Sequence, residues 1–259
     1  TSALGNPRYV QATKQALSLH SCPPGTLTLE LLETEEISPS IDLLAALDAY
    51  RQLGICLAEA DLGSGYSTLT RLREMPFDFI KIDRSIVSQA DKDPYDTLRF
   101  IYQLTRLGHS LGKQVIVEGV EDPALLAAVA LLGPNYVQGY AIAKPMPAAA
   151  LADWLDRRHG APGAQPSSNA LTRLADALLW EEGLHVINKE VPDFKAKEAM
   201  LGEMYASMLN KPAASPEEQT LRADLVSCAR RCGLRDAEYL QARGRLVSLL
   251  MQNSGSARL

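Results

Sequence analysis

Short apolar segments that end in an acidic or amide side chain recur along the N-terminal part of the chain. They read LTLELLE, ICLAEAD, FIKID, VIVEGVE and YVQGY, at residues 27–33, 55–61, 79–83, 115–121 and 136–140. The segments are apolar on both sides of the polar residue, which is the pattern of strands buried on both faces of a parallel sheet. Parallel strands need a crossover between them, and the intervening segments supply it. The pattern therefore predicts five βα units.

The intervening segments have the periodicity and the end signals of helices. In residues 94–112, leucine and isoleucine recur at helical spacing. Gly54 ends one predicted helix, and Pro123 and Pro147 begin two others. The predicted helices of this part of the chain cover 41–53, 69–74, 94–112, 123–132 and 147–158.

A change of pattern marks the predicted domain boundary. Residues 159–169 are rich in Gly, Pro and Ser, which is typical of a linker. From residue 170 on, helical patterns follow one another without strands, at 171–189, 194–209, 216–232 and 236–251. Ser215 and Glu218 have the spacing of a capping box. We predict a β/α domain over 1–158, a linker over 159–169 and an α-helical module over 170–259.

The predicted fold class is α/β. The N-terminal part is expected to be a TIM-like (β/α) barrel that lacks its first strands in this chain, followed by a small all-α domain. A closed eight-stranded barrel needs about three more βα units than the five that the pattern predicts. We expect those units to precede Thr1.

Composition narrows the class of protein. The 259 residues are 46% hydrophobic and carry a net charge of -5, with a pI of about 5.5. That balance disfavours a DNA-binding or anionic-membrane surface. No apolar run approaches the roughly 18 residues that span a bilayer, so no membrane segment is expected in this chain. The four cysteines lack the spacing of a disulfide framework, which favours the cytoplasm.

Two details of the helical module leave alternatives open. Cys228 and Cys232 lie one turn apart on a predicted helix and are either small core residues or a metal or redox pair. Glu181 and His185 share a helical face, but we find no second Glu-x-x-His element to complete a metal site. We expect the apolar stripes of this module to form its core and a partner interface.

The polar strand ends carry a more specific signal. In a parallel barrel or sheet they meet at one rim, where they are able to hold a divalent cation and a phosphate. The motifs ELLE, ADLGSGYSTL, FIKIDRSIV, VEGVED and VQGYAIAKP, in this order, resemble the EAL domain family over residues 5–155. The resemblance implies a bacterial TIM-barrel phosphodiesterase that hydrolyses cyclic di-GMP with metal-activated water. It also implies Mg²⁺ or Mn²⁺ as the cofactor.

The resemblance assigns a metal site to the rim. It implies Glu30 of ELLE, Asp61 of ADLG and Glu118 of VEGVE as metal ligands. Asp83 and Glu121 fall at acidic positions that accompany these ligands in the family. Carboxylate oxygens are the hard ligands that Mg²⁺ prefers, and such cations lower the pKa of bound water.

The resemblance also implies catalytic and nucleotide-binding residues. Lys81 matches a lysine near the attacking water, Gln138 an active-site amide, and Glu33 a residue that steadies the glycine loop. Asp61, Gln138 and Lys81 are the expected contacts of the nucleotide. For Lys81, a surface salt bridge to Asp83 is the competing interpretation.

The chain departs from the family pattern at the rim. Ala60 stands where the family has the first Asp of Asp-Asp-Phe-Gly, a metal ligand. Neighbouring Glu59 is a poor substitute, because adjacent strand residues point to opposite faces. Leu32 and Val117 replace a usual Thr and Ala. The Glu of the Glu-Ala-Leu signature and a metal-binding Asn are expected upstream of Thr1.

We therefore predict a degenerate EAL domain that acts as a catalytically impaired cyclic di-GMP receptor coupled to the helical module. One alternative is an active phosphodiesterase that produces linear pGpG; another is an interaction scaffold without nucleotide binding. The expected partners are cyclic di-GMP and a protein that binds the helical module. The resemblance also implies a homodimer, to which the helix after Asp83 contributes.

Overall fold

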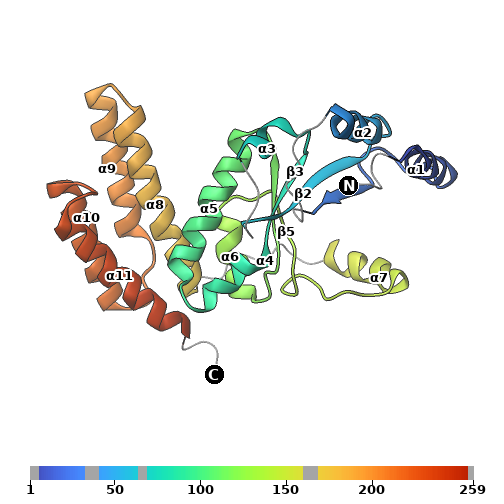
Figure 1. The fold of residues 1–259 in the computed structure, drawn as a ribbon. Coiled ribbons are helices and arrows are strands. Elements are labelled where there is room, and N and C mark those ends of the chain that lie inside the picture. The colour runs from blue at the N-terminus through green and yellow to red at the C-terminus, as the bar shows by residue number, and fades with distance from the viewer. Residues whose placement is uncertain (1–5, 33–40, 64–68, 160–168, 256–259) are drawn as a thin grey trace. The chain divides into compact units, whose positions relative to one another are not determined.

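Five parallel strands form the sheet of the protein (Figure 1). The computed structural model describes residues 6–32, 41–63, 69–159 and 169–255. The strand order is β1-β2-β3-β4-β5, so each strand pairs with its neighbours in sequence, as successive βα units require. The strands are β1 (Thr28–Leu31), β2 (Cys56–Leu62), β3 (Phe79–Ile82), β4 (Gln114–Val117) and β5 (Tyr136–Val137). Each lies within or beside the apolar segment that predicts it.

The helices that alternate with these strands begin and end close to the predicted residues. They are α2 (Ile41–Gln52), α3 (Leu69–Glu74), α5 (Pro94–Ser110), α6 (Pro123–Leu131) and α7 (Ala148–His159). Two further helices, α1 (Pro7–Leu19) and α4 (Arg84–Val87), and the 3-10 turn η1 (Ser88–Asp91) had no predicted counterpart. None of the residues of α1 is buried.

Contacts divide the chain into two compact units. The first comprises residues 1–89, 100–121 and 133–143 and holds the sheet. The second comprises 90–99, 122–132 and 144–259 and holds α6 and the C-terminal helices. Helix α5 is therefore shared between the units. The predicted linker at 159–169 lies, apart from its two end residues, outside the described residues.

The core of the first unit is built on β2. A cluster of buried side chains joins β1, α2, β2 and the segment before β3: Leu31, Leu47, Leu57, Met75 and Phe77. A second cluster joins β2, α3 and β3: Leu62, Leu72 and Ile80. Residues 57–60 of β2 are all buried, which agrees with a strand covered on both faces.

The C-terminal part of the chain is helical, as predicted. It consists of α8 (Ala170–Glu190), α9 (Phe194–Asn210), α10 (Pro216–Cys232) and α11 (Ala237–Gly255). Helix α8 packs against α6, α9 and α11, and α10 packs against α9 and α11. No helix in the described part of the chain is both long and apolar enough to cross a bilayer.

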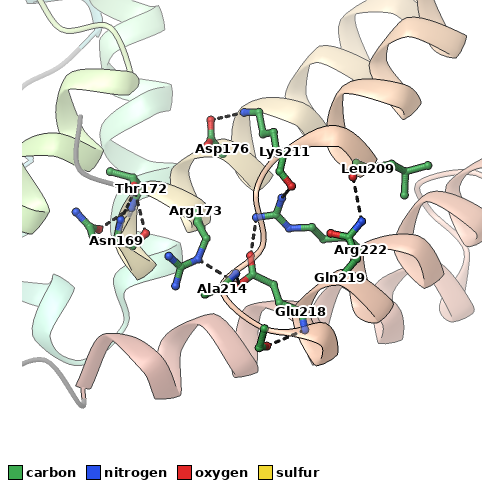
Figure 2. A network of polar contacts seen from close by, with 11 residues as sticks. Asn169, Thr172, Arg173, Asp176, Leu209, Lys211, Ala214, Glu218, Gln219 and Arg222 are labelled. Carbon is green, nitrogen blue, oxygen red and sulfur yellow. Dashed lines mark hydrogen bonds and ion pairs between the residues drawn. The ribbon is translucent and has the colours of Figure 1, made fainter. Parts of the chain in front are cut away.

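A buried carboxylate organises the start of α10 (Figure 2). Glu218 is 0% exposed and lies between two guanidinium groups, 2.5 Å from Nη2 of Arg222 and 3.2 Å from Nε of Arg173. Its amide donates to Ser215 Oγ at 3.1 Å, which is one half of the predicted capping box. Its carboxylate accepts from the amide of Ala214, one residue before the expected position. Because each of its oxygens has a partner, the buried charge is compensated.

We expect Gly139→Ala to destabilise the first unit. The loop after β5 runs so close to the loop after β4 that a Cβ on Gly139 would lie 2.1 Å from the carbonyl oxygen of Val120. Backbone atoms cannot move aside as a flexible side chain would, so the variant should lose about 1–3 kcal/mol of unfolding free energy. Urea unfolding followed by circular dichroism measures this loss.

Gly202→Ala is the matched control. Gly202 lies in α9, and apart from its chain neighbours and the backbone of its own helix no described atom lies within 4 Å of the place that an added methyl group would take. Removing a glycine from a helix interior should leave stability unchanged or raise it by up to about 1 kcal/mol. Equal stabilities for Gly139→Ala and the wild type would show that the two loops are not held at this distance.

Candidate functional site

Three carboxylates converge at the carboxyl ends of neighbouring strands. Asp61 is the penultimate residue of β2, Asp83 follows β3, and Glu118 follows β4. One oxygen from each lies within 4.8 Å of the others, and all three residues are half-buried. We call these residues the rim carboxylates. Parallel strands bring their ends to the same edge, so the arrangement follows from the sheet topology.

An irregularity in β2 places Asp61 in this group. Glu59 pairs with Ile80 but Leu62 pairs with Ile82, so β2 has one more residue than β3 over this stretch. Asp61 has a φ of 62°, in the left-handed region, which Asp enters more readily than most residues. A bulge of this kind redirects a side chain and interrupts the alternation of the strand. The strained backbone is therefore tied to the position of a rim carboxylate.

Glu59 is committed to a different partner. It is 0% exposed, and its carboxylate forms a two-point contact with Arg71 of α3 at 2.8 and 2.9 Å. Breaking such a buried pair is costly, so Glu59 stays with Arg71 and is not expected to act as a metal ligand. Ala60 itself is 3% exposed. It lies two residues after Ala58, the register partner of Glu30, and directly before Asp61.

Lys81 links the rim carboxylates to β1. Its ammonium group lies 2.6 Å from Glu30 Oε1 and 2.5 Å from Glu118 Oε1. Burial lowers the pKa of Lys81, but its hydrogen bonds to Glu118 and Glu30 outweigh burial, and the net shift is upward. The buried ammonium is therefore charged at neutral pH. Its partners are these two glutamates, so a surface salt bridge to Asp83 does not describe it.

Asp83 has two tasks. It is the N-cap of α4, where its Oδ1 accepts from the amide of Ser85 at 2.9 Å. Burial raises the pKa of Asp83, but hydrogen bonds from Ser85 and the nearby Arg84 lower it by more, so the net shift of the pKa is downward. The carboxyl is therefore ionised at neutral pH. From the sequence, Asp83 was expected only to accompany the metal ligands. A lone Asp before a four-residue helix gives no stronger signal.

The remaining predicted residues divide into two groups. Gln138 follows β5 and is exposed. Its backbone N–H donates to Val117 O at 2.8 Å, and its backbone carbonyl accepts from Val120 N at 3.2 Å. These bonds join the backbone of Gln138 to the loop that carries Glu118. Glu33 and the turn at 64–68 lie outside the described residues. Glu121, the other accompanying acid, is exposed.

The donor set fits a divalent cation. The rim carboxylates offer hard oxygen ligands, and such ligands select Mg²⁺, Mn²⁺ or Ca²⁺. Glu30 and Glu118, both predicted as ligands, each contact Lys81, and Asp83 lies near Asp61 and Glu118 in a place that the sequence did not assign to it. A cation held there would supply positive charge beside an anionic phosphodiester and lower the pKa of bound water.

Two residue pairs of the helical module were left open by the sequence, namely Glu181 with His185 and Cys228 with Cys232. Glu181 is buried and bonded to Tyr95 and Arg243, while His185 is exposed, so these two do not form a metal site. The thiols of Cys228 and Cys232 are free and half-buried, and Cys232 Sγ lies 3.1 Å from the carbonyl oxygen of Cys228. They are not joined by a disulfide.

Comparison with known proteins identifies the family. The sequence pattern of the EAL domain matches residues 1–145, which is more than half of the chain and includes every residue of the rim. The chain belongs to the EAL domain family. The fold agrees, because solved EAL structures superpose on this one. The EAL enzyme Bd1971, with cAMP and cyclic di-GMP bound, gives a TM-score of 0.54 at 27% identity over 59% of this chain and 40% of its own.

The curated relatives of this EAL protein are longer. The cyclic di-GMP phosphodiesterase RocR of Pseudomonas aeruginosa is 36% identical over 146 residues, which is 56% of this chain and 37% of RocR. The cyclic di-GMP phosphodiesterase PdeR of Escherichia coli is 34% identical over 143 residues, 55% of this chain and 21% of PdeR. The chain thus spans well under half the length of these curated relatives. Among solved structures, the PaMucR phosphodiesterase in complex with cyclic di-GMP gives a TM-score of 0.52 at 30% identity over 57% of this chain and 60% of its own.

We expect Lys81→Met to lower the stability of this EAL protein in a pH-dependent way. A group whose pKa is raised on folding stabilises the fold below its unfolded pKa of 10.5 and loses that contribution as the pH rises through the folded value. The loss of two charge-assisted hydrogen bonds should cost about 1.5–3 kcal/mol at pH 8. The difference from wild type should shrink above pH 10.5. Urea unfolding at several pH values, with EDTA present, measures it.

Lys92→Met serves as the control, because Lys92 is exposed. Its unfolding free energy should follow that of the wild type across the pH series. A constant difference between Lys81→Met and wild type from pH 8 to beyond the raised pKa would contradict the role assigned to the ammonium charge.

Proposed function

We propose that this chain is an EAL module of cyclic di-GMP signalling that binds the dinucleotide but hydrolyses it poorly. The observation that carries the proposal is Ala60. It is buried two residues after Ala58, the register partner of Glu30, and stands where the family pattern has a metal-binding Asp. A methyl group offers no ligand, and losing a supporting partner of a metal typically costs 10- to 100-fold in affinity or activity.

The rest of the rim supports nucleotide binding. Lys81 supplies a positive charge at the carboxyl end of β3, and Gln138 offers both an amide donor and an acceptor at the end of β5. Asp61 is able to accept hydrogen bonds from a guanine edge or to hold a cation. Two relatives, RocR and PdeR, are named cyclic di-GMP phosphodiesterases, which supports this ligand for the present chain.

We infer that the five strands are part of an EAL-type barrel that further strands complete. The superposed Bd1971 and PaMucR chains extend beyond the matched region, which covers 40% and 60% of them. In such a barrel the outer strands β1 and β5 would each gain a neighbour.

A second function, slow phosphodiesterase activity, has one observation in its favour. Asp83 joins Asp61 and Glu118 within 4.8 Å, so the chain retains three converging carboxylates without position 60. In this case Lys81 and Gln138 would orient the phosphodiester, and the rim carboxylates would hold Mg²⁺ or Mn²⁺. The two functions differ in turnover and not in the ligand.

We expect cyclic di-GMP to bind in the presence of Ca²⁺. Isothermal titration of the protein should show saturable binding. Asp61→Asn and Asp83→Asn should each weaken it about tenfold or more, because each removes a charged oxygen that a cation or the ligand would use. Asp48→Asn, an exposed residue of α2, is the control and should bind as the wild type does. No binding with or without Ca²⁺ would favour the scaffold alternative.

We expect Ala60→Asp to raise turnover. The wild type with Mn²⁺ should release little linear pGpG, and the substitution should increase the rate at least about tenfold by restoring a carboxylate next to Asp61. Anion-exchange chromatography of the products measures the rate, and circular dichroism checks that the new carboxylate is accommodated. Fast turnover by the wild type, or a folded variant without any gain, would overturn the assignment of Ala60 as the impairing residue.

A further inference from the structure

Helix α5 belongs to both compact units. Its first turns, up to Arg99, group with the C-terminal helices, and the remainder, from Phe100, groups with the sheet. Helix α6 also groups with the C-terminal helices and packs against α8. The bundle of α8–α11 is therefore joined to two helices of the βα series.

A buried polar contact attaches the first turn of α5 to the bundle. The hydroxyl of Tyr95 donates to Oε2 of Glu181 in α8 at 3.1 Å. Arg243 of α11 donates to the other oxygen of Glu181 at 2.9 Å. Tyr95 and Glu181 are each 7% exposed, so the hydroxyl and the guanidinium replace the water that the carboxylate has lost. Burial, followed by the nearby charge of Glu181, raises the pKa of Tyr95, which keeps the hydroxyl protonated as a donor.

Helix α6 is held by the same bundle. Its N-cap is Asp122, which accepts from the amides of Ala124 and Leu125. The side-chain amide of Asn169, the N-cap of α8, donates to the carbonyl of Ala124 at 3.4 Å. The first turn of α6 is thus tied to the first turn of α8.

These two helices follow the loops that carry two of the rim carboxylates. Asp83 leads through α4 and η1 into α5, and Glu118 leads through three residues to the cap of α6. The two loops also touch, because a Cβ on Gly119 would lie 2.3 Å from Cβ of Arg84. Short stretches of chain therefore connect Asp83 and Glu118 to the two helices that contact the bundle.

We propose that the α8–α11 bundle sets the cation affinity of the rim carboxylates by holding α5 and α6, with Glu181 as the positioning residue. The inference rests on the proposed function in one respect, namely that the rim carboxylates bind a cation. Carboxylates that the fold already holds near their metal-bound separation bind a cation more tightly, because less conformational entropy is lost on binding. By linkage, a cation at the rim must in turn favour the bundle arrangement in which Glu181 is bonded to Tyr95.

Two conservative variants test the proposal by their affinity for Mn²⁺. Tyr95→Phe removes one oxygen and the hydrogen bond to Glu181, and Glu181→Gln removes the charge. Each should weaken Mn²⁺ binding at least about fivefold, the lower end of typical coupling between sites. Calorimetry and the electron paramagnetic resonance signal of free Mn²⁺ measure the affinity without any turnover.

Tyr239→Phe is the matched control. Tyr239 lies in α11, is 0% exposed, and its hydroxyl has no hydrogen-bond partner among the described residues. The substitution removes a buried hydroxyl from the same bundle without breaking a bond, so Mn²⁺ affinity should stay at the wild-type value. A loss of Mn²⁺ affinity equal to that of Tyr95→Phe would mean that any destabilisation of the bundle weakens Mn²⁺ binding. That result would overturn the role of Glu181.

Hydrogen exchange tests the reverse direction. Saturating Mn²⁺ should slow amide exchange in α8 around Glu181 in the wild type, and not in Asp83→Asn. If the wild type binds Mn²⁺ but folded Tyr95→Phe and Glu181→Gln bind it equally well, the coupling is wrong while the proposed function stands. If the wild type does not bind Mn²⁺, the proposal that the rim carboxylates bind a cation is wrong, and the proposed coupling to the bundle is wrong as well.

Discussion

The ammonium of Lys81 lies between carboxylates from two other segments of the sheet. Glu30 comes from β1 and Glu118 follows β4, while Lys81 comes from β3. A buried ammonium is costly unless it is paired, and carboxylates gathered at one rim repel one another unless a cation lies between them. The ammonium of Lys81 therefore reduces the repulsion between Glu30 and Glu118, and the two carboxylates offset the cost of burying the ammonium. Because β2 lies between β1 and β3, the contact with Glu30 also requires small side chains there, and Ala58 pairs with Glu30.

The proposed effect of Ala60 rests on the same balance of charges. An aspartate at this buried position would add a negative charge next to Asp61, and a divalent cation would help to balance it. With alanine, the carboxylates near Lys81 carry one negative charge fewer. Less negative charge then remains for a metal to neutralise, and we expect a metal to gain less by binding.

The sequence predicts the parts of the fold that depend on local pattern. Apolar runs located the five described strands, and Gly54, Pro123 and Pro147 located three helix ends to within two residues, because these signals act locally. The bulge at Asp61 could not be predicted, since it depends on the register between β2 and β3. The same holds for Glu181, which the sequence paired with His185 one turn away. Its partners, Tyr95 and Arg243, lie 86 and 62 residues distant along the chain.

The composition of helix α6 indicates burial, although its sequence shows no helical alternation of apolar and polar residues. Its sequence, PALLAAVAL, contains no polar side chain, so it has no face suited to water. A helix that is apolar all round has to be covered on more than one side. Leu125, Ala128 and Val129 are buried, and α8 packs against this helix. A Gly- and Pro-rich stretch between two patterns marks a break in local structure, but it does not reveal which helices need cover. The apolar sequence of α6 requires a neighbour, and α8, which follows that stretch, provides it.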